Sequence, residues 1–453
     1  MLTKVRPVEM RGTIFSRLLL VTVLTLLFLS CPVQAAARYN GTWQSGSGGG
    51  KVKAIHYRSG KYRLIDLKSG KTLTVSSVKK GARLKKTAWK KKAAQLWTVK
   101  KNKNGTITFL SVKNKRYALS ITKEKATLEK KSGAKSMSFA KETSAPRKAG
   151  AGGISSAANG VSQNGWLSVR GTQLVNEHGS PLVLRGMSSH GLQWYSNFTT
   201  SNAIGATAAY GANLFRVAMY TEENGYLSNK SGILEKLYDA VDAALSRNMY
   251  VIIDWHILSD FNPKTHQSEA KTFFNRVSAH YANTPGVLYE ICNEPNGGTG
   301  WKEIKSYANA VIPVIRKNSP RSVIIVGTPT WSQDVDVAAA DPLSYANVMY
   351  AFHFYAGTHG QWLRDKVSMA LSKGAPVFVS EWGTSAADGN GGVYKSAANI
   401  WISFMKQHSL SWANWSLCDK SESSAALKPG ANAENGIGEK ELSASGKYVF
   451  SQF

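Results

Sequence analysis

Eight short apolar runs recur through the second half of the chain, each followed by enough residues for a helix. Uninterrupted apolar runs are typical of strands that a parallel sheet buries on both faces. We expect these strands at residues 182–187, 213–218, 250–254, 287–292, 322–327, 348–353, 377–381 and 412–416. Helical spacing of apolar residues predicts helices at 233–247, 269–281 and 301–316. Together these units predict an α/β fold, the (β/α)8 TIM barrel, over residues 161–453, with a hairpin at 165–176 closing its base.

The pattern before the barrel is different, because short strands follow one another with turns and no helix between them. Strands are expected at residues 62–67, 72–78, 96–99, 106–112 and 116–121, with turns at 68–71 and 103–105. This pattern predicts a small all-β module over residues 38–145. Residues 146–160 are rich in glycine, alanine and serine, so we interpret them as a flexible linker.

The first 37 residues have the pattern of a cleaved signal peptide. Basic residues up to Arg17 precede an apolar run at 18–29, and the small residues Ala35 and Ala37 offer cleavage sites. The apolar run is short for a membrane span. We therefore expect residues 1–37 to be removed and the mature protein to be secreted; an uncleaved membrane anchor is the alternative.

Charge divides the chain in the same way. Of the formal net charge of +29, residues 38–150 contribute +26, from 24 lysines and six arginines against four acidic residues. The leader contributes +3, so residues 151–453 are neutral. Such segregation indicates two modules with different partners. Anionic cell-wall or matrix polymers are the expected partners of the basic module, and no motif indicates specific binding of nucleic acid.

Cysteine usage argues against a disulfide or a metal in the barrel. Cys292 and Cys418 lie at the ends of the fourth and eighth predicted strands, on opposite sides of the barrel. A bridge requires Cα atoms within ~7 Å of one another, so we expect two buried free thiols. Neither CxxC nor HExxH spacing occurs, and we expect no metal site and no cofactor.

Two of the predicted strands deliver a glutamate. The strand at 287–292 stops at Asn293-Glu294-Pro295, because proline cannot continue a central strand. The strand at 377–381 delivers Glu381 just before a glycine turn at Gly383. The C-terminal ends of barrel strands meet at one mouth, where such folds carry their chemistry. A pair of carboxylates placed there is what a glycosidase requires.

Polar and aromatic side chains follow the other strands of the predicted barrel as well. In chain order they are His190, Trp194, Tyr195, Arg216, Tyr220, Asp254, His256, Trp331, His353, Tyr355, Trp415, Lys420 and Glu422. One such residue alone is most often structural, but convergence on a single mouth predicts a binding cleft. Glu290 precedes its strand end, so we expect it to face the surroundings of the barrel. We expect Asp254 to belong to a buried network.

These residues resemble glycoside hydrolase family 5, and within it the bacterial endo-β-1,4-glucanases. The resemblance spans residues 161–453, and its motifs stand in family order. They are Arg185-Gly-Met-Ser-Ser-His-Gly-Leu-Gln-Trp-Tyr195, Phe215-Arg-Val-Ala-Met-Tyr220, Asp254-Trp-His256, Glu290-Ile-Cys-Asn-Glu-Pro295, His353-Phe-Tyr355, Ser380-Glu-Trp-Gly383 and Trp415-Ser-Leu-Cys-Asp-Lys420.

The resemblance implies a role for each catalytic residue. Glu294 would be the general acid/base and Glu381 the nucleophile of a retaining reaction, in which the carboxyls lie ~5–5.5 Å apart. Arg216 and Tyr355 would hold the nucleophile, and Asn293 would donate to a sugar 2-hydroxyl.

Further residues would complete the site by the same resemblance. His256 and His353 would belong to the polar shell around the carboxylates. Trp194 and Trp415 would stack on sugar rings on the non-reducing side, and Trp331 on the leaving-group side, because flat aromatic side chains bury apolar sugar faces. The other substrate-binding residues would be His190, Tyr195, Tyr220, Lys420 and Glu422.

The basic module has a resemblance of its own. Gln95-Leu-Trp97, followed by Asn104-Gly-Thr-Ile107, resembles the Q-x-W signature of ricin-type β-trefoil lectins. This implies a trefoil-like fold for residues 38–145 and the binding of carbohydrate or cell-wall polymer. A solubilising module without a sugar site is the alternative.

The resemblances together imply a secreted endo-β-1,4-glucanase, or cellulase, that acts on β-1,4-glucan as a monomer. Other β-1,4-glycanases of the family stay open, namely a mannanase, a xyloglucanase or a lichenase, because they differ in loops that the sequence does not define. A non-catalytic carbohydrate-binding wall protein is the alternative from another class. The presence of both glutamates with Arg216, Asn293 and Tyr355 argues against it.

Overall fold

The fold was analysed in a computed structural model. It describes residues 41–45, 51–58, 60–66, 69, 71–102, 106–122, 125–133, 138–139 and 153–453. The predicted signal peptide at 1–37, the turn at 103–105 and residues 146–152 of the predicted linker lie outside these ranges. The chain divides into two compact units, Met1–Lys141 and Glu142–Phe453.

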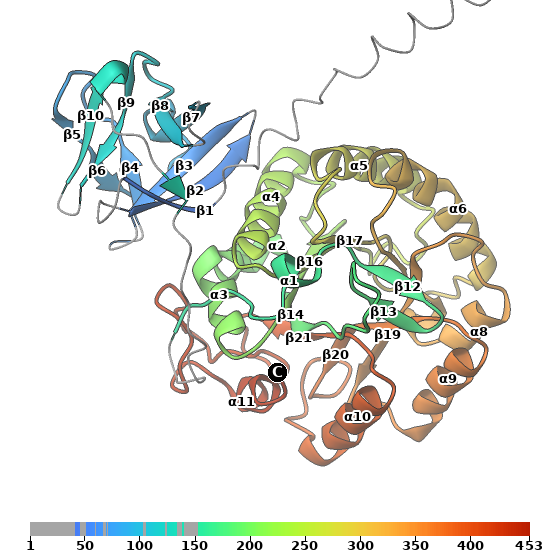
Figure 1. Cartoon of the computed structure of the whole chain (residues 1–453). Helices are drawn as coiled ribbons and strands as arrows, with labels where there is room; N and C mark the ends of the chain where they lie inside the picture. The colour runs from blue at the N-terminus through green and yellow to red at the C-terminus, as the bar shows by residue number, and fades with distance from the viewer. Residues whose placement is uncertain are drawn as a thin grey trace, which may run out of the picture. The chain divides into compact units, whose positions relative to one another are not determined.

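The N-terminal unit is all-β, as its pattern predicts, and its described strands pair antiparallel (Figure 1). The order along the sheet is β11-β1-β2-β3-β7-β8-β9-β10-β5, and β4 pairs with both β3 and β6. The elements are β1 Gly41–Gln44, β2 Lys51–Arg58, β3 Lys61–Asp66, β4 Thr72–Thr74, β5 Ala82–Arg83, β6 Lys85–Thr87, η1 Ala93–Gln95, β7 Leu96–Lys101, β8 Ile107–Ser111, β9 Tyr117–Ile121, β10 Ala126–Lys130, η2 Lys131–Gly133 and β11 Ser138–Phe139.

Gln95 and Trp97, the defining residues of the Q-x-W stretch, have structural roles in this unit. Trp97 is fully buried in the core beside Phe109 and Tyr62. The side chain of Gln95 is also buried; its amide donates to the carbonyl of Ala88 at 2.7 Å, and its oxygen accepts from the backbone N–H of Lys90 at 2.7 Å. Gln95 therefore satisfies the backbone of the turn that leads into η1.

The C-terminal unit is a closed barrel of eight parallel strands in chain order, inside a ring of helices (Figure 1). The strands are β14 Arg185–Ser189, β15 Leu214–Tyr220, β16 Tyr250–His256, β17 Val287–Glu290, β18 Ile324–Val326, β19 Val348–Tyr355, β20 Val377–Gly383 and β21 Trp412–Leu417. The helices are α1 Val161–Asn164, α2 Leu192–Tyr195, η3 Ser196–Thr199, α3 Ser201–Ala209, α4 Lys230–Ser246, α5 Gln267–His280, α6 Trp301–Asn318, α7 Pro329–Ser332, α8 Val335–Ala340, α9 Gln361–Ser372, α10 Lys395–Gln407 and α11 Ala444–Phe450.

The eight strands expected from the apolar runs are confirmed, with shifted ends. β15 and β16 extend to Tyr220 and His256, so these side chains belong to the strands rather than to the loops beyond them. β17 stops early, at Glu290, because the chain leaves the sheet on its way to Pro295. α3, α9 and α10 were not anticipated individually.

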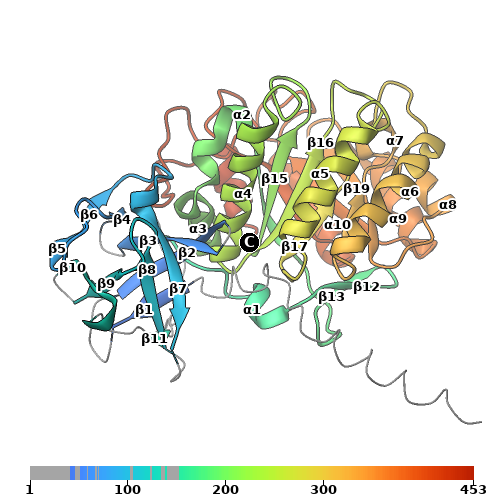
Figure 2. The ribbon, with the colours of Figure 1, turned by 90° about the horizontal axis from the view of Figure 1, so that it is seen from above.

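The base of the barrel is closed as expected. The antiparallel hairpin β12 Ser168–Arg170 and β13 Gln173–Val175 lies with α1 at the end opposite α2 and α7 (Figure 2). Tyr250 at the start of β16 donates its hydroxyl to the carbonyl of Gly165 at 2.8 Å. Apolar side chains fill the lower interior, among them Ile252, Met349 and Phe378. The lower interior of the barrel is therefore largely apolar.

Residues 153–160, the described part of the predicted linker, pack against the barrel. The backbone N–H groups of Ser155 and Ala157 donate to the carbonyls of Gly205 and Arg247, each at 2.8 Å, and Ala157 is buried. This stretch is anchored on α3 and α4, so the barrel unit begins before Val161.

Cys292 and Cys418 are buried free thiols, as predicted. Within the ranges that the structure describes, no helix combines the length and the apolar character that crossing a membrane requires.

Candidate active site

A cleft of about 610 Å³ opens at the C-terminal ends of the barrel strands. Twelve of the fifteen predicted site residues line it: His190, Trp194, Tyr220, His256, Glu294, Trp331, His353, Tyr355, Glu381, Trp415, Lys420 and Glu422. Arg216 and Asn293 lie buried behind this lining. Tyr195 is not among the lining residues; its ring packs against His190, with 4.9 Å between ring centroids.

Seven lining residues were missed by the sequence reasoning. They are Glu223, Leu258, Gln333, His359, Ala387, Asp388 and Gly389. All lie beyond strand ends, in segments whose path the hydrophobic pattern does not define. Glu223 had the clearest signal, since the acidic pair Glu222-Glu223 follows β15 directly.

Glu381, at the end of β20, is held as a carboxylate from two sides. One oxygen accepts the hydroxyl of Tyr355 at 2.7 Å, and the other accepts Nη1 of Arg216 at 3.0 Å. Burial alone would raise the pKa of Glu381, but the charges of His353 and Arg216 outweigh it and lower this pKa. The side chain is therefore ionised and fixed in orientation.

Glu294 has the opposite electrostatic character. It is mostly buried just after β17, and one carboxyl oxygen accepts Nδ1–H of His353 at 2.9 Å. Burial raises its pKa and the nearby charge of Glu381 raises it further, against the opposing hydrogen bond from His353. Glu294 is thus the carboxyl that keeps a proton while Glu381 does not.

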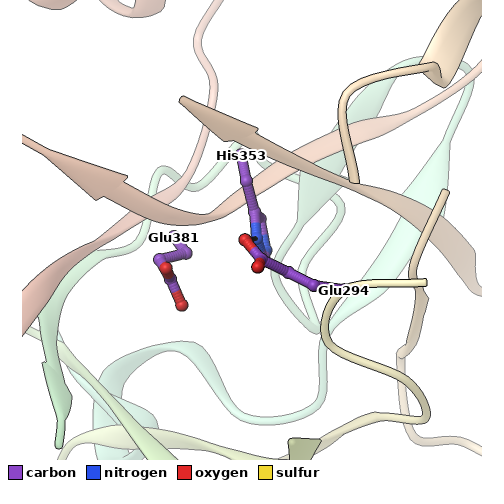
Figure 3. Close-up of side chains that lie close together, drawn as sticks. All are labelled: Glu294, His353 and Glu381. Atoms are coloured by element: carbon purple, nitrogen blue, oxygen red, sulfur yellow. Dashed lines mark hydrogen bonds and ion pairs between the residues drawn. The ribbon is translucent and has the colours of Figure 1, made fainter. Parts of the chain in front are cut away.

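The two carboxyl groups face each other across a short gap (Figure 3). A nitrogen of His353 and one oxygen each from Glu294 and Glu381 all lie within 4.8 Å of one another. Carboxyls this close, with pKa values moved in opposite directions, suit an acid working beside a nucleophile.

The same three side chains could in principle ligate a cation, but His353 is not prepared for it. Burial alone would lower its pKa, but the carboxylate of Glu290 at 3.7 Å and the hydrogen bond to Glu294 outweigh burial and raise it to about 9. Both ring nitrogens therefore carry protons at neutral pH, and a metal ligand needs a free lone pair on nitrogen.

Asn293 and His256 are joined by hydrogen bonds behind the carboxylates. Nδ2 of Asn293 donates to Nε2 of His256 at 3.2 Å and to the carbonyl of Ile257 at 3.1 Å, while Oδ1 accepts Nη2 of Arg216 at 2.7 Å. Burial lowers the pKa of His256 to about 3, so the neutral ring donates Nδ1–H to Asp254 at 2.6 Å. A bond from Asn293 to a sugar hydroxyl would therefore be shared with one of these protein acceptors.

Aromatic side chains form the walls of the cleft. Trp415 stacks on His256 with 5.3 Å between ring centroids, and His190 packs against Trp415 at 4.9 Å. Trp194 and Trp331 stay 46% and 45% exposed, although large apolar side chains are normally buried. Exposed indole planes beside carboxylates suit the apolar faces of sugar rings.

The turn that carries Trp331 is held in an unusual conformation. Thr330, Trp331 and Ser332 in α7 have φ values of 57°, 55° and 57°, in the left-handed region. Two hydrogen bonds hold the turn against the segment 293–295, which carries Glu294. Trp331 N–H donates to the carbonyl of Pro295 at 2.9 Å, and the Ser332 hydroxyl donates to the carbonyl of Asn293 at 2.6 Å.

The expectation for Glu290 was wrong. This side chain is fully buried inside the barrel and does not face its surroundings. Its two oxygens accept Nε of Arg216 at 2.7 Å and the hydroxyl of Ser380 at 2.6 Å. Glu290 lies two residues after Leu288, which packs in the barrel interior, so the two side chains point to the same side of β17. Asp254 lies in the buried network as expected, 3.0 Å from Arg216.

Comparison with known families decides the identity of the barrel. Residues 175–421 match the family model described as cellulase (glycosyl hydrolase family 5), which is more than half of the chain. The chain belongs to glycosyl hydrolase family 5. Residues 40–132 match the model of the ricin-type beta-trefoil lectin domain-like family, which supports the second resemblance.

Characterised family 5 relatives are similar over the barrel. An endoglucanase of Clostridium saccharobutylicum is 54% identical over 291 residues, covering 64% of this chain and 65% of the relative. Endoglucanase A of Evansella cellulosilytica is 57% identical over 274 residues, covering 60% of this chain and 56% of the relative. The chain thus spans less than two thirds of the length of these relatives.

Solved family 5 structures agree with the fold. Cellulase Cel5C_n superposes with a TM-score of 0.63 at 48% identity, covering 65% of this chain and 94% of that structure. The catalytic domain of Thermobifida fusca endoglucanase Cel5A gives 0.62 at 40% identity, with 64% and 98% covered. These matches support the (β/α)8 barrel.

Proposed function

We propose that this protein is a secreted endo-β-1,4-glucanase that hydrolyses internal β-1,4-glucosidic bonds of cellulose-type chains with retention at the anomeric carbon. The observation that carries the proposal is the Glu294–Glu381 pair, with oxygens within 4.8 Å and pKa values moved apart. Inverting glycosidases need about 6.5–9.5 Å between carboxyls to admit a water molecule. Relatives named endoglucanase support the substrate class.

The reaction would proceed in two displacements. Glu381 attacks the anomeric carbon while Glu294 gives its proton to the leaving oxygen, so the glycosidic bond breaks as a glycosyl–Glu381 ester forms. Glu294, now ionised, removes a proton from water, which hydrolyses the ester from the same face and releases Glu381. Arg216 and Tyr355 stabilise the carboxylate of Glu381 before and after the ester exists.

The remaining cleft residues would bind the chain of sugars. We assign the stacking positions to Trp194, Trp415 and Trp331, as the family resemblance implies. Gly191 N–H donates to Nδ1 of His190 at 2.7 Å, and burial lowers the pKa of His190 to about 3, so Nε2–H of the neutral ring is free to donate to a hydroxyl. Lys420 and Glu422 are 2.5 Å apart and offer a paired donor and acceptor.

The experiment that tests this proposal follows the first product by proton NMR. With a soluble cellulose derivative, the new reducing end is expected to appear as the β-anomer before mutarotation, with viscosity falling faster than reducing ends accumulate. An α-anomer formed first would contradict retention. A parallel panel of β-glucan, glucomannan and xyloglucan tests the substrate: a clear preference for glucomannan or xyloglucan would make the protein one of the alternative glycanases.

For the basic module we propose binding of anionic cell-wall or matrix polymers. Exposed basic side chains crowd residues 79–92, namely Lys79, Lys80, Arg83, Lys85, Lys90 and Lys92, and the stretch contains no acidic residue. Lys86 in the same stretch pairs with Asp66 at 2.9 Å. Unpaired surface cations attract polyanions over roughly a Debye length, about 10 Å at 0.1 M salt.

Replacing Lys85, Lys90 and Lys92 together by glutamine is expected to weaken binding to heparin, a soluble acidic polysaccharide, at least about tenfold at 50 mM salt. A matched triple replacement of the exposed barrel lysines Lys395, Lys406 and Lys447 should leave binding unchanged. Equal affinities in both variants, or binding that resists 500 mM salt, would contradict an electrostatic site.

A protein lacking residues 38–145 but keeping 146–160 should still hydrolyse soluble substrate.

A further inference from the structure

Glu290 lies at the centre of a buried hydrogen-bond network that reaches both carboxyl groups of the active site. On one side, Arg216 donates Nε to Glu290 at 2.7 Å and Nη1 to Glu381 at 3.0 Å. On the other side, Ser380 donates its hydroxyl to Glu290 at 2.6 Å and lies 2.9 Å from Nε2 of His353.

The direction of the Ser380 hydrogen determines whether Nε2 of His353 carries a proton. Because this hydroxyl donates to Glu290, its oxygen can only accept from His353, so Nε2 must carry a proton. If Nδ1 lacked a proton, it would accept the acidic proton of Glu294 at 2.9 Å and draw it away from the cleft. With both ring nitrogens protonated, Oε1 of Glu294 accepts from His353, and the proton of Glu294 is left on the oxygen that faces the substrate.

Charge balance supports the same assignment. Buried charges persist only when they are paired. Arg216 and His353 are the two cations around Glu290, and Glu290 and Glu381 are the two anions that match them, because burial raises the pKa of Asp254 well above its ordinary value and so keeps Asp254 protonated. Burial opposes the ionisation of Glu290, but the charges of Arg216 and His353 lower its pKa to about 2. His353 lies 3.7 Å from Glu290, which is its counter-ion away from the cleft.

We propose that Glu290 is a positioning residue for the reaction proposed above: its negative charge, 3.7 Å from the ring, keeps His353 an imidazolium, and this fixed cation beside both catalytic carboxyls sets the pH range of activity. The charged and titratable groups packed around Glu290 are Arg216 on β15, Asp254 and His256 on β16, Glu294 after β17, His353 on β19 and Glu381 on β20. The inference rests on the assignment of Glu294 and Glu381 as acid and nucleophile.

Glu290→Gln tests the proposal, because the amide has nearly the same shape and no charge. Nε–H of Arg216 still needs an acceptor, so the glutamine oxygen must face it and the NH2 group must face Ser380. The Ser380 hydroxyl then turns its hydrogen toward Nε2 of His353, and the ring becomes neutral. The nearby cation that favours ionisation of both Glu294 and Glu381 is thereby lost.

The sign of the pH effect follows. Activity begins as Glu381 ionises and ends as Glu294 loses its proton. Loss of the His353 charge raises the pKa of both carboxyls, whereas loss of the Glu290 charge lowers it. His353 is the nearer group, within 4.8 Å of both carboxyls, so its effect dominates, and both limbs of the kcat/KM profile should move upward by about 1 unit. At the acid limb this amounts to about a tenfold loss of kcat/KM. A purely structural role would reduce the rate but leave both limbs in place.

Ser380→Ala is the matched control within the same chain. It removes a buried hydrogen bond but leaves the charge of Glu290 3.7 Å from His353. Its profile should keep both limbs within about 0.3 unit of the wild type, even where the rate falls. If Glu290→Gln behaves like Ser380→Ala, or if its limbs move downward, the proposal is wrong.

A second measurement needs neither a stable variant nor a cleaved substrate. In the full-length protein labelled with 15N-histidine, the two ring nitrogens of His353 should have the similar shifts of an imidazolium at pH 7, with the signal assigned by its loss in His353→Gln. Widely separated shifts, as in neutral imidazole, would overturn the proposal even if Glu290→Gln does not fold. If the wild type cleaves no β-glucan while His353 is an imidazolium, the proposed function fails and the charge assignment stands.

Discussion

Replacing Glu381 by alanine is expected to lower kcat on soluble cellulose derivatives by at least about 10⁴-fold, the scale of losing a catalytic nucleophile. The carboxylate forms the covalent bond, and among the described residues no other carboxylate is grouped with Glu294 and His353 within 4.8 Å. Arg216 would keep Glu290 and Asp254 as partners, so the variant should remain folded. Initial rates of reducing-end release, with circular dichroism as a fold check, measure the effect.

Azide provides a sharper test of the same residue. It can enter the space that the missing carboxylate leaves and attack from the same face, so Glu381→Ala with azide should release an α-glycosyl azide. The exposed Glu439→Ala is the control and should retain wild-type rates. Residual activity of Glu381→Ala within tenfold of wild type would show that another group is the nucleophile.

Glu294→Gln should have the second largest effect, a loss of about 10²–10⁴-fold in kcat on polysaccharide, the usual contribution of a general acid. The glutamine oxygen can still accept from His353, so the loss reports on the proton rather than on packing. On dinitrophenyl β-cellobioside, whose leaving group needs no proton, the first step should be nearly as fast as in wild type. A pre-steady-state burst of dinitrophenol measures it.

The comparison between substrates makes the role of Glu294 testable. Glu381→Ala should lose activity on both polysaccharide and dinitrophenyl β-cellobioside. Glu294→Gln should slow the first step on polysaccharide only. If Glu294→Gln suppresses the dinitrophenol burst as strongly as polysaccharide hydrolysis, Glu294 is not the acid and the assignment of the pair is wrong.

The barrel was predictable because its strands are buried on both faces. An apolar run such as 250–254 is stable only where both faces of the strand are buried. The proline of Asn293-Glu294-Pro295 marks where its strand must stop. The same logic placed Glu294 and Glu381 at the mouth, and the structure brings them together. Lining residues such as Gln333 and Ala387 could not be predicted, because loop paths depend on contacts rather than on periodicity.

Glu290 shows where the reasoning along one strand failed. Side chains of a strand alternate in direction, but that alternation does not say which set points inward in a run that is apolar throughout. Glu290 was assigned to the outside because it precedes the strand end, but that position does not define the direction of its side chain. Its partners, Arg216 and Ser380, come from distant strands that only the closed barrel brings near.

The left-handed turn at Thr330–Ser332 has a consequence for engineering. Each non-glycine residue in this region costs roughly 1–2 kcal/mol relative to a relaxed backbone, so the folded protein maintains a loop that would gain by rearranging. Glycine at position 330 or 332 would relieve that cost and also release the indole of Trp331 from its fixed orientation. Directed evolution toward heat tolerance and toward tight substrate binding would therefore select opposite sequences at Thr330 and Ser332.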